Sequence, residues 1–183
     1  MSNKTEKRIS GKEIYNGKIV SLVCDEVELP NGAVALREVV KHIGAAAIIP
    51  LTDDGMVIME RQFRYPHGRD VLEIPAGKLN FKGEDPLECA RRELYEETGA
   101  TAGRYTDLGM LISSPAILEE KIWLYLAEEL SFGERRLDED EFIDVELIPL
   151  KALYEMVLGG EISDAKTQIA ILKAAAMRPE HLK

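Results

Sequence analysis

Residues 77–100 read GKLNFKGEDPLECARRELYEETGA, which concentrates charged side chains in one short segment. Asp85 is a favourable N-cap, Pro86 fits the first position of a helix, and Gly99 can end a helix in the left-handed conformation. The segment therefore predicts a helix that begins at Pro86 and ends at Gly99, with both ends specified by local residues.

Three glutamates of this helix, Glu93, Glu96 and Glu97, are spaced i, i+3, i+4, so their side chains leave from neighbouring points of one turn. Like charges at this spacing repel one another, and a divalent cation that accepts several hard oxygen ligands would relieve the repulsion. The apolar stripe on the opposite side, which we expect to pack on the core, consists of Leu87, Ala90 and Leu94.

A solvated acidic face is the alternative interpretation of such a helix. Arg91 and Arg92 would then partly neutralise the glutamates through pairs at i and i+4. The helix alone does not decide between a solvated face and a metal site.

The whole string resembles the Nudix box, a glycine followed at fixed spacing by Glu and then by Arg-Glu-aliphatic-x-Glu-Glu-x-Gly. Glu84, the seven-residue gap to Arg92, and each specified position up to Gly99 match this pattern. The loop between Gly77 and Glu84 is one residue longer than usual, which a surface loop can absorb.

The resemblance implies an α/β protein with the Nudix α/β/α sandwich, in which a mixed sheet lies between helices. It covers residues 44–183, the expected Nudix hydrolase domain. Residues 1–43 resemble the N-terminal antiparallel β-region of the ADP-ribose pyrophosphatase branch, whose members often form dimers by exchanging such strands. We therefore expect a homodimer, and the length of 183 residues predicts no second full domain.

Gly, Pro and Asp-Gly pairs mark the expected elements along the chain. Residues 18–29 and 33–41 read as two strands joined by a hairpin turn at Pro30-Asn31-Gly32. Residues 44–51 and 56–62 suggest a second hairpin, whose first strand is apolar enough to be buried on both faces. The remaining expected elements are strands at 71–74, 105–112, 121–127 and 145–148 and helices at 150–158 and 164–177.

Length, composition and net charge limit the size of the domain, the kinds of molecule it can bind and its expected location. The chain has 183 residues, 45% of them hydrophobic, which is enough for one domain with a substantial core. Its net charge of −10 argues against a nucleic-acid or membrane partner, because both need clustered Lys and Arg. A polar N-terminus, no apolar run of membrane-spanning length, and only two cysteines favour the cytoplasm.

The resemblance also implies a reaction: hydrolysis of the diphosphate bond of ADP-ribose, or a related nucleoside diphosphate sugar, to AMP and ribose 5-phosphate with Mg²⁺ or Mn²⁺. Glu93 and Glu97 would be direct metal ligands, and Glu96 a further or water-mediated one. The other implied metal contacts are the backbone carbonyl of Ala76 and the side chain of Glu84.

Further residues match positions that this family uses for substrate and catalysis. Arg64 matches an arginine that grips phosphate, and Arg92 would orient a neighbouring glutamate. The general base that takes a proton from water would be Glu141, with Glu139 as the alternative. Three other positions match substrate-binding positions of that branch: Glu73, Pro115 and Glu120.

Two alternatives stay open at this point. The substrate could be another nucleoside diphosphate derivative, such as GDP-mannose, NADH or coenzyme A, because the box reads only the diphosphate. The chain could instead be a module that senses ADP-ribose without turnover, although sensors of this kind often have damaged boxes and this box keeps each charged position.

Overall fold

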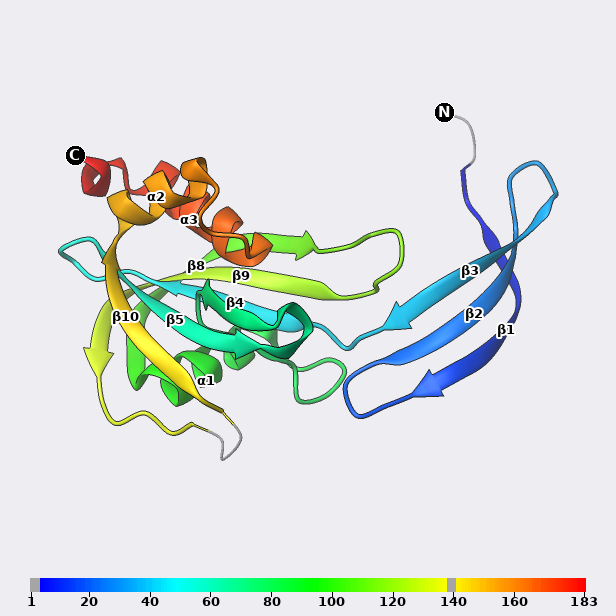
Figure 1. Cartoon of the computed structure of the whole chain (residues 1–183), viewed down its shortest axis with the longest axis horizontal. Helices are drawn as coiled ribbons and strands as arrows, with labels where there is room; N and C mark the ends of the chain where they lie inside the picture. Colours follow the sequence, from blue (N-terminus) through cyan, green and yellow to red (C-terminus); the bar gives the residue numbers. More distant parts are fainter. Residues whose placement is uncertain (1–3, 138–140) are drawn as a thin grey trace. The chain divides into compact units, whose positions relative to one another are not determined.

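The structure, a computed structural model, describes residues 4–137 and 141–183 and falls into two compact units. The first unit comprises Met1–Gly44 with Ile112–Lys121, and the second comprises Ala45–Leu111 with Ile122–Lys183. Each unit contains its own β-sheet structure (Figure 1). In the described part of the chain, no helix is both long and apolar enough to cross a membrane.

The first unit is built on a three-stranded antiparallel sheet in the order β1-β2-β3. Its strands are β1 (Lys7–Asn16), β2 (Ser21–Glu28) and β3 (Val34–Lys41). The predicted hairpin between β2 and β3 is confirmed. Its turn contains Gly32 at φ 82°, and the side chain of Asn31 accepts a hydrogen bond from the Ala33 amide.

Strand β1 was not among the predicted elements. Its sequence, KRISGKEIYN, is exposed along its whole length and has no regular alternation of polar and apolar residues. The register against β2 shifts between Arg8 and Ser10 and again between Glu13 and Tyr15. Each β-bulge moves the following side chains to the other face, so the period of two that identifies a strand is lost.

The second unit contains two sheets. A four-stranded mixed sheet has the order β7-β4-β9-β8, with β4 parallel to β9 and antiparallel to β7, and a three-stranded antiparallel sheet has the order β10-β5-β6. The strands are β4 (Ala45–Pro50), β5 (Met56–Arg64), β6 (Arg69–Glu73), β7 (Ala76–Lys78), β8 (Ala100–Ile112), β9 (Lys121–Phe132) and β10 (Ile143–Pro149). The helices are α1 (Pro86–Thr98), α2 (Leu150–Gly159) and α3 (Ala165–Met177), with short 3₁₀ turns η1 (Tyr65–His67) and η2 (Pro179–Leu182).

The predicted second hairpin is wrong. The turn itself forms, because the Gly55 amide donates to the Thr52 carbonyl and Gly55 has φ 84°. The strands on either side of it then separate into different sheets, with an isolated bridge between Leu51 and Val57 beside the turn. Strand β4 finds its partners in β7 and β9, and β5 finds its partners in β6 and β10.

Helices cover both faces of the mixed sheet in the second unit (Figure 1). Residues 46–49 of β4 are fully buried, as the apolar run predicted. Ala46 and Ile48 pack with α1, and Ala47 and Ile49 pack with α2 and α3. Because successive strand residues point to opposite faces, these two groups define the two sides of an α/β/α sandwich, which confirms the predicted fold.

Both ends of α1 follow the local signals. The Asp85 carboxylate accepts a hydrogen bond of 2.9 Å from the Leu87 amide, and Pro86 is the first helical residue. Gly99 ends the helix at φ 73° and donates to the Tyr95 carbonyl at 2.8 Å. A Cβ on Gly99 would lie 2.5 Å from the Gly133 carbonyl oxygen, so this position needs glycine for both conformation and space.

The side chain that holds α1 on the sheet is Leu94, which is fully buried in the cluster with Ile48 and Ile58. We expect Leu94→Ala to lower the free energy of unfolding by about 2–5 kcal/mol, because it removes a buried side chain and leaves a cavity. Denaturant unfolding monitored by circular dichroism measures this change. Leu158→Ala on α2 is the control, since Leu158 is exposed and should lose little. Equal stability of the Leu94 variant and the wild type would contradict the packing described.

Candidate active site

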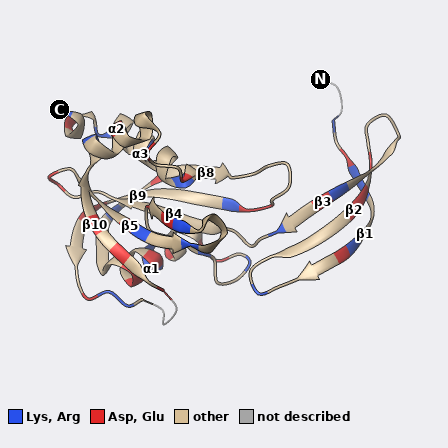
Figure 2. Ribbon diagram, in the orientation of Figure 1, with Lys and Arg blue, Asp and Glu red and all other residues tan. Residues whose placement is uncertain are grey.

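Two glutamates of α1 are buried. Glu93 is 7% exposed and Glu97 is 4% exposed, whereas the Glu96 side chain is 38% exposed. A solvated acidic face is therefore the wrong interpretation for Glu93 and Glu97. Figure 2 shows acidic residues along α1 and β10 and basic residues on β5, all within the second unit. Burying carboxylates is costly unless a hydrogen bond or a cation compensates, so the partners of these two side chains decide what the site can do.

Arg92 is the cation nearest to Glu93. Its Nη1 donates to Glu93 Oε1 at 2.7 Å and to Glu96 Oε2 at 3.2 Å, and its Nη2 donates to the Lys78 carbonyl at 3.3 Å. Burial raises the pKa of Glu93 to about 7, although Arg92 acts in the opposite direction. The structure thus places Arg92 where it fixes the orientation of Glu93.

Gly77 makes room for the Glu93 carboxylate. A Cβ at position 77 would lie 1.9 Å from Glu93 Oε1 and 2.4 Å from Oε2, so a larger residue there would displace this carboxylate. The glycine that opens the box therefore lets the Glu93 carboxylate occupy the space of the missing side chain.

Glu97 is anchored to the strand that precedes the box. Its Oε2 accepts a hydrogen bond of 3.0 Å from the Ala76 amide. Burial raises the pKa of Glu97, and the negative charges of Glu60, Glu93 and Glu141 raise it further. The Ala76 backbone, predicted as a metal contact, thus lies beside a predicted metal-ligating carboxylate.

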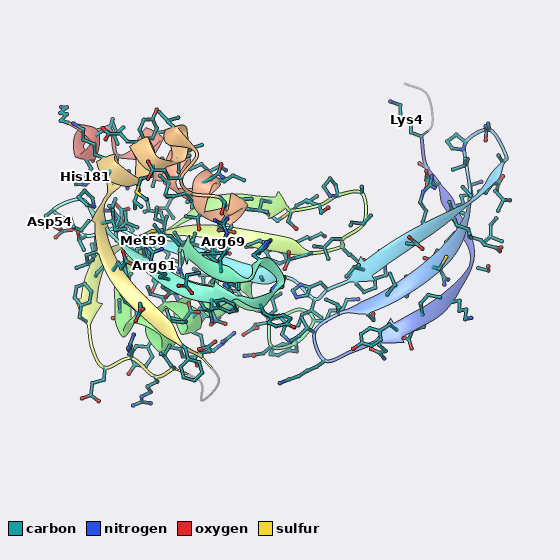
Figure 3. All side chains as sticks on the ribbon, in the orientation of Figure 1. Lys4, Asp54, Met59, Arg61, Arg69 and His181 are labelled. Carbon is teal, nitrogen blue, oxygen red and sulfur yellow. The ribbon has the colours of Figure 1, made fainter. Side chains whose placement is uncertain are left out.

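Glu60 is a member of this cluster that the sequence interpretation missed. It lies on β5 between Met59 and Arg61, two residues that Figure 3 labels, and it is 4% exposed. It pairs in register with Glu73 of β6, and its side chain forms a hydrogen bond with Glu97. Burial raises its pKa, as does the charge of Glu73. One feature of the sequence could have identified Glu60. It stands two positions after Ile58, so both side chains lie on the face of β5 that is turned to α1.

Glu73 has the opposite surroundings, because two cations face it. Arg64 donates to it through Nε at 2.7 Å and through Nη2 at 3.0 Å, and Lys166 of α3 contacts its Oε2. Burial alone would raise the pKa of Glu73, but the hydrogen bonds and charges of these cations lower it below its ordinary value. Lys166, which also contacts Asp164 at 3.1 Å, is a second residue that the sequence did not reveal.

The other predicted site residues are Glu84, the two candidates for the general base, and two residues of the first unit. Glu84 accepts a hydrogen bond from the Asn80 amide and lies 3.9 Å from Arg92 Nη2. The charge of Glu141 acts on Glu60, Glu93 and Glu97, whereas Glu139 lies outside the described residues.

Pro115 and Glu120 belong to the first compact unit. Glu120 contacts Ser113 Oγ at 3.2 Å and His42 Nδ1 at 3.4 Å. The assignment of Pro115 and Glu120 to substrate binding stays a prediction.

The described residues of the site offer the oxygen ligands that a hard divalent cation prefers, but their side chains are not arranged around one point. Within residues 4–137 and 141–183, no group of three or more His, Cys, Asp and Glu side chains is arranged to hold a metal ion. Glu93 is instead oriented by Arg92, and Glu97 by the Ala76 amide. The donors are nonetheless oxygens, which Mg²⁺ and Mn²⁺ prefer, and Glu60 Oε1 is buried with no hydrogen-bond partner among the described residues.

Comparison with known proteins identifies the family of this chain. The family model of the NUDIX domain matches residues 41–168, and the model of the nucleoside diphosphate sugar hydrolase N-terminal domain matches residues 6–40. The chain is 47% identical over 173 residues to the ADP-ribose pyrophosphatase of Bacillus subtilis (strain 168), with 93% of each chain covered. It is 43% identical over 168 residues to the methanol dehydrogenase activator of Bacillus methanolicus, covering 91% of this chain and 90% of that one.

A solved structure supports the fold independently. The crystal structure of an ADP compounds hydrolase matches 98% of this chain and 97% of its own, with a TM-score of 0.85 at 21% sequence identity. The chain belongs to the Nudix family, and it is a Nudix hydrolase. The resemblance of residues 77–100 to the Nudix box is confirmed.

The buried glutamates give the metal-free protein a distinctive dependence of stability on pH. The pKa of Glu93 rises from 4.5 to about 7 on folding, so between these values the folded state binds more protons than the unfolded state. Stability therefore falls as the pH rises, by up to about 1.4 kcal/mol per pH unit for each such group. Glu60 and Glu97, whose pKa values are also raised, extend the fall to higher pH. Glu73 has a lowered pKa, so the stability that its ionised form contributes is lost only as the pH falls below 4.5.

Denaturant unfolding with EDTA between pH 5 and 8 measures this dependence. The Glu93→Gln variant is the control, because it should show a shallower fall over the lower part of the range. Stability that climbs steadily from pH 5 to 8 in the wild type would contradict the burial of these charges.

Proposed function

We propose that this chain hydrolyses the diphosphate bond of ADP-ribose to AMP and ribose 5-phosphate, with Mg²⁺ or Mn²⁺ held by glutamates of α1. The observation that carries the proposal is the burial of Glu93 and Glu97 side by side, with more negative than positive charge around them. The choice of ADP-ribose as the substrate is supported by the Bacillus subtilis relative, an ADP-ribose pyrophosphatase that this chain matches over 93% of its length.

The acidic residues of the site would hold the cation. Glu93 and Glu97 offer their carboxylates, the Ala76 carbonyl offers a backbone oxygen, and Glu96 and Glu84 are further candidates. When bound, the cation neutralises the phosphates and lowers the pKa of a coordinated water. Arg92 keeps Glu93 in position through its 2.7 Å hydrogen bond.

Arg64 is the proposed contact for a phosphate of the substrate. Its guanidinium is oriented by two hydrogen bonds to Glu73, and Lys166 holds Glu73 from the other side. A guanidinium held in one plane can bind a phosphate through two parallel hydrogen bonds, which a lysine cannot. The ion pair with Glu73 therefore prepares Arg64 for substrate binding.

The chemical step is attack of water on one phosphorus of the diphosphate. A new phosphorus–oxygen bond forms to the water oxygen, and the bond from that phosphorus to the bridging oxygen breaks. The proton of the water passes to a carboxylate, for which we propose Glu141, with Glu139 as the alternative. Glu141 suits this role because its charge acts on Glu60, Glu93 and Glu97, so it lies near the buried glutamates.

A substrate panel tests the proposed function. ADP-ribose, GDP-mannose, NADH and coenzyme A are each incubated with the protein and with Mg²⁺, Mn²⁺ or EDTA, and the products are separated by chromatography. We expect AMP and ribose 5-phosphate from ADP-ribose and no reaction in EDTA. Faster turnover of another compound would move the assignment to that compound, and binding of ADP-ribose without metal-dependent turnover would identify a sensing module.

The substitution Glu97→Gln tests the assignment of the ligands. It removes one buried negative charge while keeping the shape of the side chain, so we expect turnover of ADP-ribose to fall at least about 100-fold with the fold intact. Glu88→Gln on the same helix is the matched control, because Glu88 is exposed and pairs only with Arg91 among the contacts described. Nearly full activity of the Glu97 variant would refute the assignment.

We also propose that the first unit mediates a homodimer. Its sheet exposes apolar side chains on β3, with Val34 at 62% and Leu36 at 63% exposure. Large exposed apolar side chains in a small sheet indicate an interaction surface, and a three-stranded sheet gains stability by packing on a second copy.

Sedimentation velocity checks the dimer. We expect the wild type to sediment as a dimer and Leu36→Glu to shift it towards monomer, because a charge at this apolar surface opposes association. Phe132→Glu, which changes an exposed apolar residue of the second unit, should sediment as the wild type does. A monomeric wild type at micromolar concentration would overturn the proposal.

A further inference from the structure

Glu60 occupies an unusual position for a carboxylate. The four residues before it on β5 are apolar, and Ile58, which points to the same face of the strand, packs in the core beneath α1. Glu60 is itself buried, and one of its oxygens, Oε1, has no hydrogen-bond partner among the described residues. An ionised carboxylate in such a position is strongly disfavoured unless a cation meets it.

The cations near Glu60 are already engaged. Its in-register neighbour on β6 is Glu73, and both Arg64 and Lys166 are bound to that neighbour. The in-register neighbour on β10 is Val145, which offers no charge. The side chain of Glu60 also interacts with Glu97, another acidic residue. Within residues 4–137 and 141–183, Arg64 and Lys166 form their ion pairs with Glu73, and Glu60 has no ion pair of its own.

We propose that Glu60 is a further ligand of the divalent cation that Glu93 and Glu97 bind. The side chain of Glu60 interacts with Glu97, and its Oε1 has no hydrogen-bond partner among the described residues, so a cation bound by Glu97 would satisfy it. The inference rests on the proposed function, because it assumes that the α1 glutamates bind a metal. It adds a ligand from outside the Nudix box, on a strand of the other sheet of the same unit.

This position has a physical consequence for the site. The ligands proposed above lie on α1 and, through the Ala76 carbonyl, on β7 of the mixed sheet, whereas Glu60 would add a ligand from β5 of the second sheet. An additional carboxylate also increases the negative charge around the cation, which raises affinity for divalent metals. The cost is greater electrostatic repulsion within the protein when no metal is bound.

Binding of Mn²⁺ alone, without substrate, tests the inference. Free Mn²⁺ is measured by electron paramagnetic resonance during titration of the wild type, Glu60→Gln and Glu60→Val. Gln keeps the shape of the side chain, and Val suits a buried strand position and should fold normally. We expect both variants to bind Mn²⁺ about tenfold more weakly or worse, because a direct ligand should cost at least as much as an outer-shell partner. Glu128→Gln is the control, since Glu128 is also buried but pairs with Arg178, and it should bind as the wild type does.

Thermal unfolding separates a ligand from a residue that merely supports the fold. In EDTA, Glu60→Val should melt above the wild type because a buried carboxyl group has been removed. With Mn²⁺, its melting temperature should rise less than that of the wild type. A purely structural Glu60 would instead lower the melting temperature in EDTA when replaced and leave the Mn²⁺-dependent rise unchanged.

The outcomes distinguish this inference from the proposed function. Wild-type Mn²⁺ affinity in both Glu60 variants would overturn the inference, even if ADP-ribose were hydrolysed with a metal. Weakened Mn²⁺ binding in both variants would support it, even if ADP-ribose proved not to be the substrate. Failure of the wild type to bind Mn²⁺ would overturn both the inference and the metal site on which it rests.

Discussion

Two buried carboxylates on α1 determine which residues can face this helix. Helix α1 packs on the sheet through Leu94, yet it also keeps Glu93 and Glu97 out of water. The segment facing it therefore has to leave space for one carboxylate and offer a donor to the other. Gly77 leaves the space and the Ala76 amide is the donor, and both belong to β7, which pairs with β4 at the centre of the fold.

The parts of the fold that the sequence predicted correctly are those with local or one-dimensional causes. The start of α1 at Pro86 and its end at Gly99 depend on residues within one turn of each end. The burial of β4 on both faces follows from an unbroken apolar run. Strand β1 and the separation of β4 from β5 could not be predicted in this way. The bulges of β1 conceal its period, and the choice of partners for β4 and β5 depends on strands that follow much later in the chain.

The same distinction applies to the site. The box spacing placed Glu93 and Glu97 on one turn, and the structure brings the predicted Arg64 and Glu73 into direct contact. Glu60 was missed because it is the first polar residue after the apolar run of β5, where a strand commonly reaches the solvent. Its register opposite Glu73 and its interaction with Glu97, which the structure supplies, show that it lies inside the site. Lys166 was missed for a related reason, since it approaches Glu73 from α3, 93 residues further along the chain.

The cations of the site are few and already paired, which determines how an anionic diphosphate can bind. Arg64 and Lys166 share Glu73, and Lys166 also contacts Asp164, so these four side chains carry no net formal charge. Arg92 faces Glu93 and Glu96, which leaves the carboxylates in excess. A diphosphate entering such a site is repelled unless divalent cations reverse the sign of the local field. The proposed cation is therefore needed for substrate binding as well as for the chemical step, and it has to arrive before the substrate or together with it.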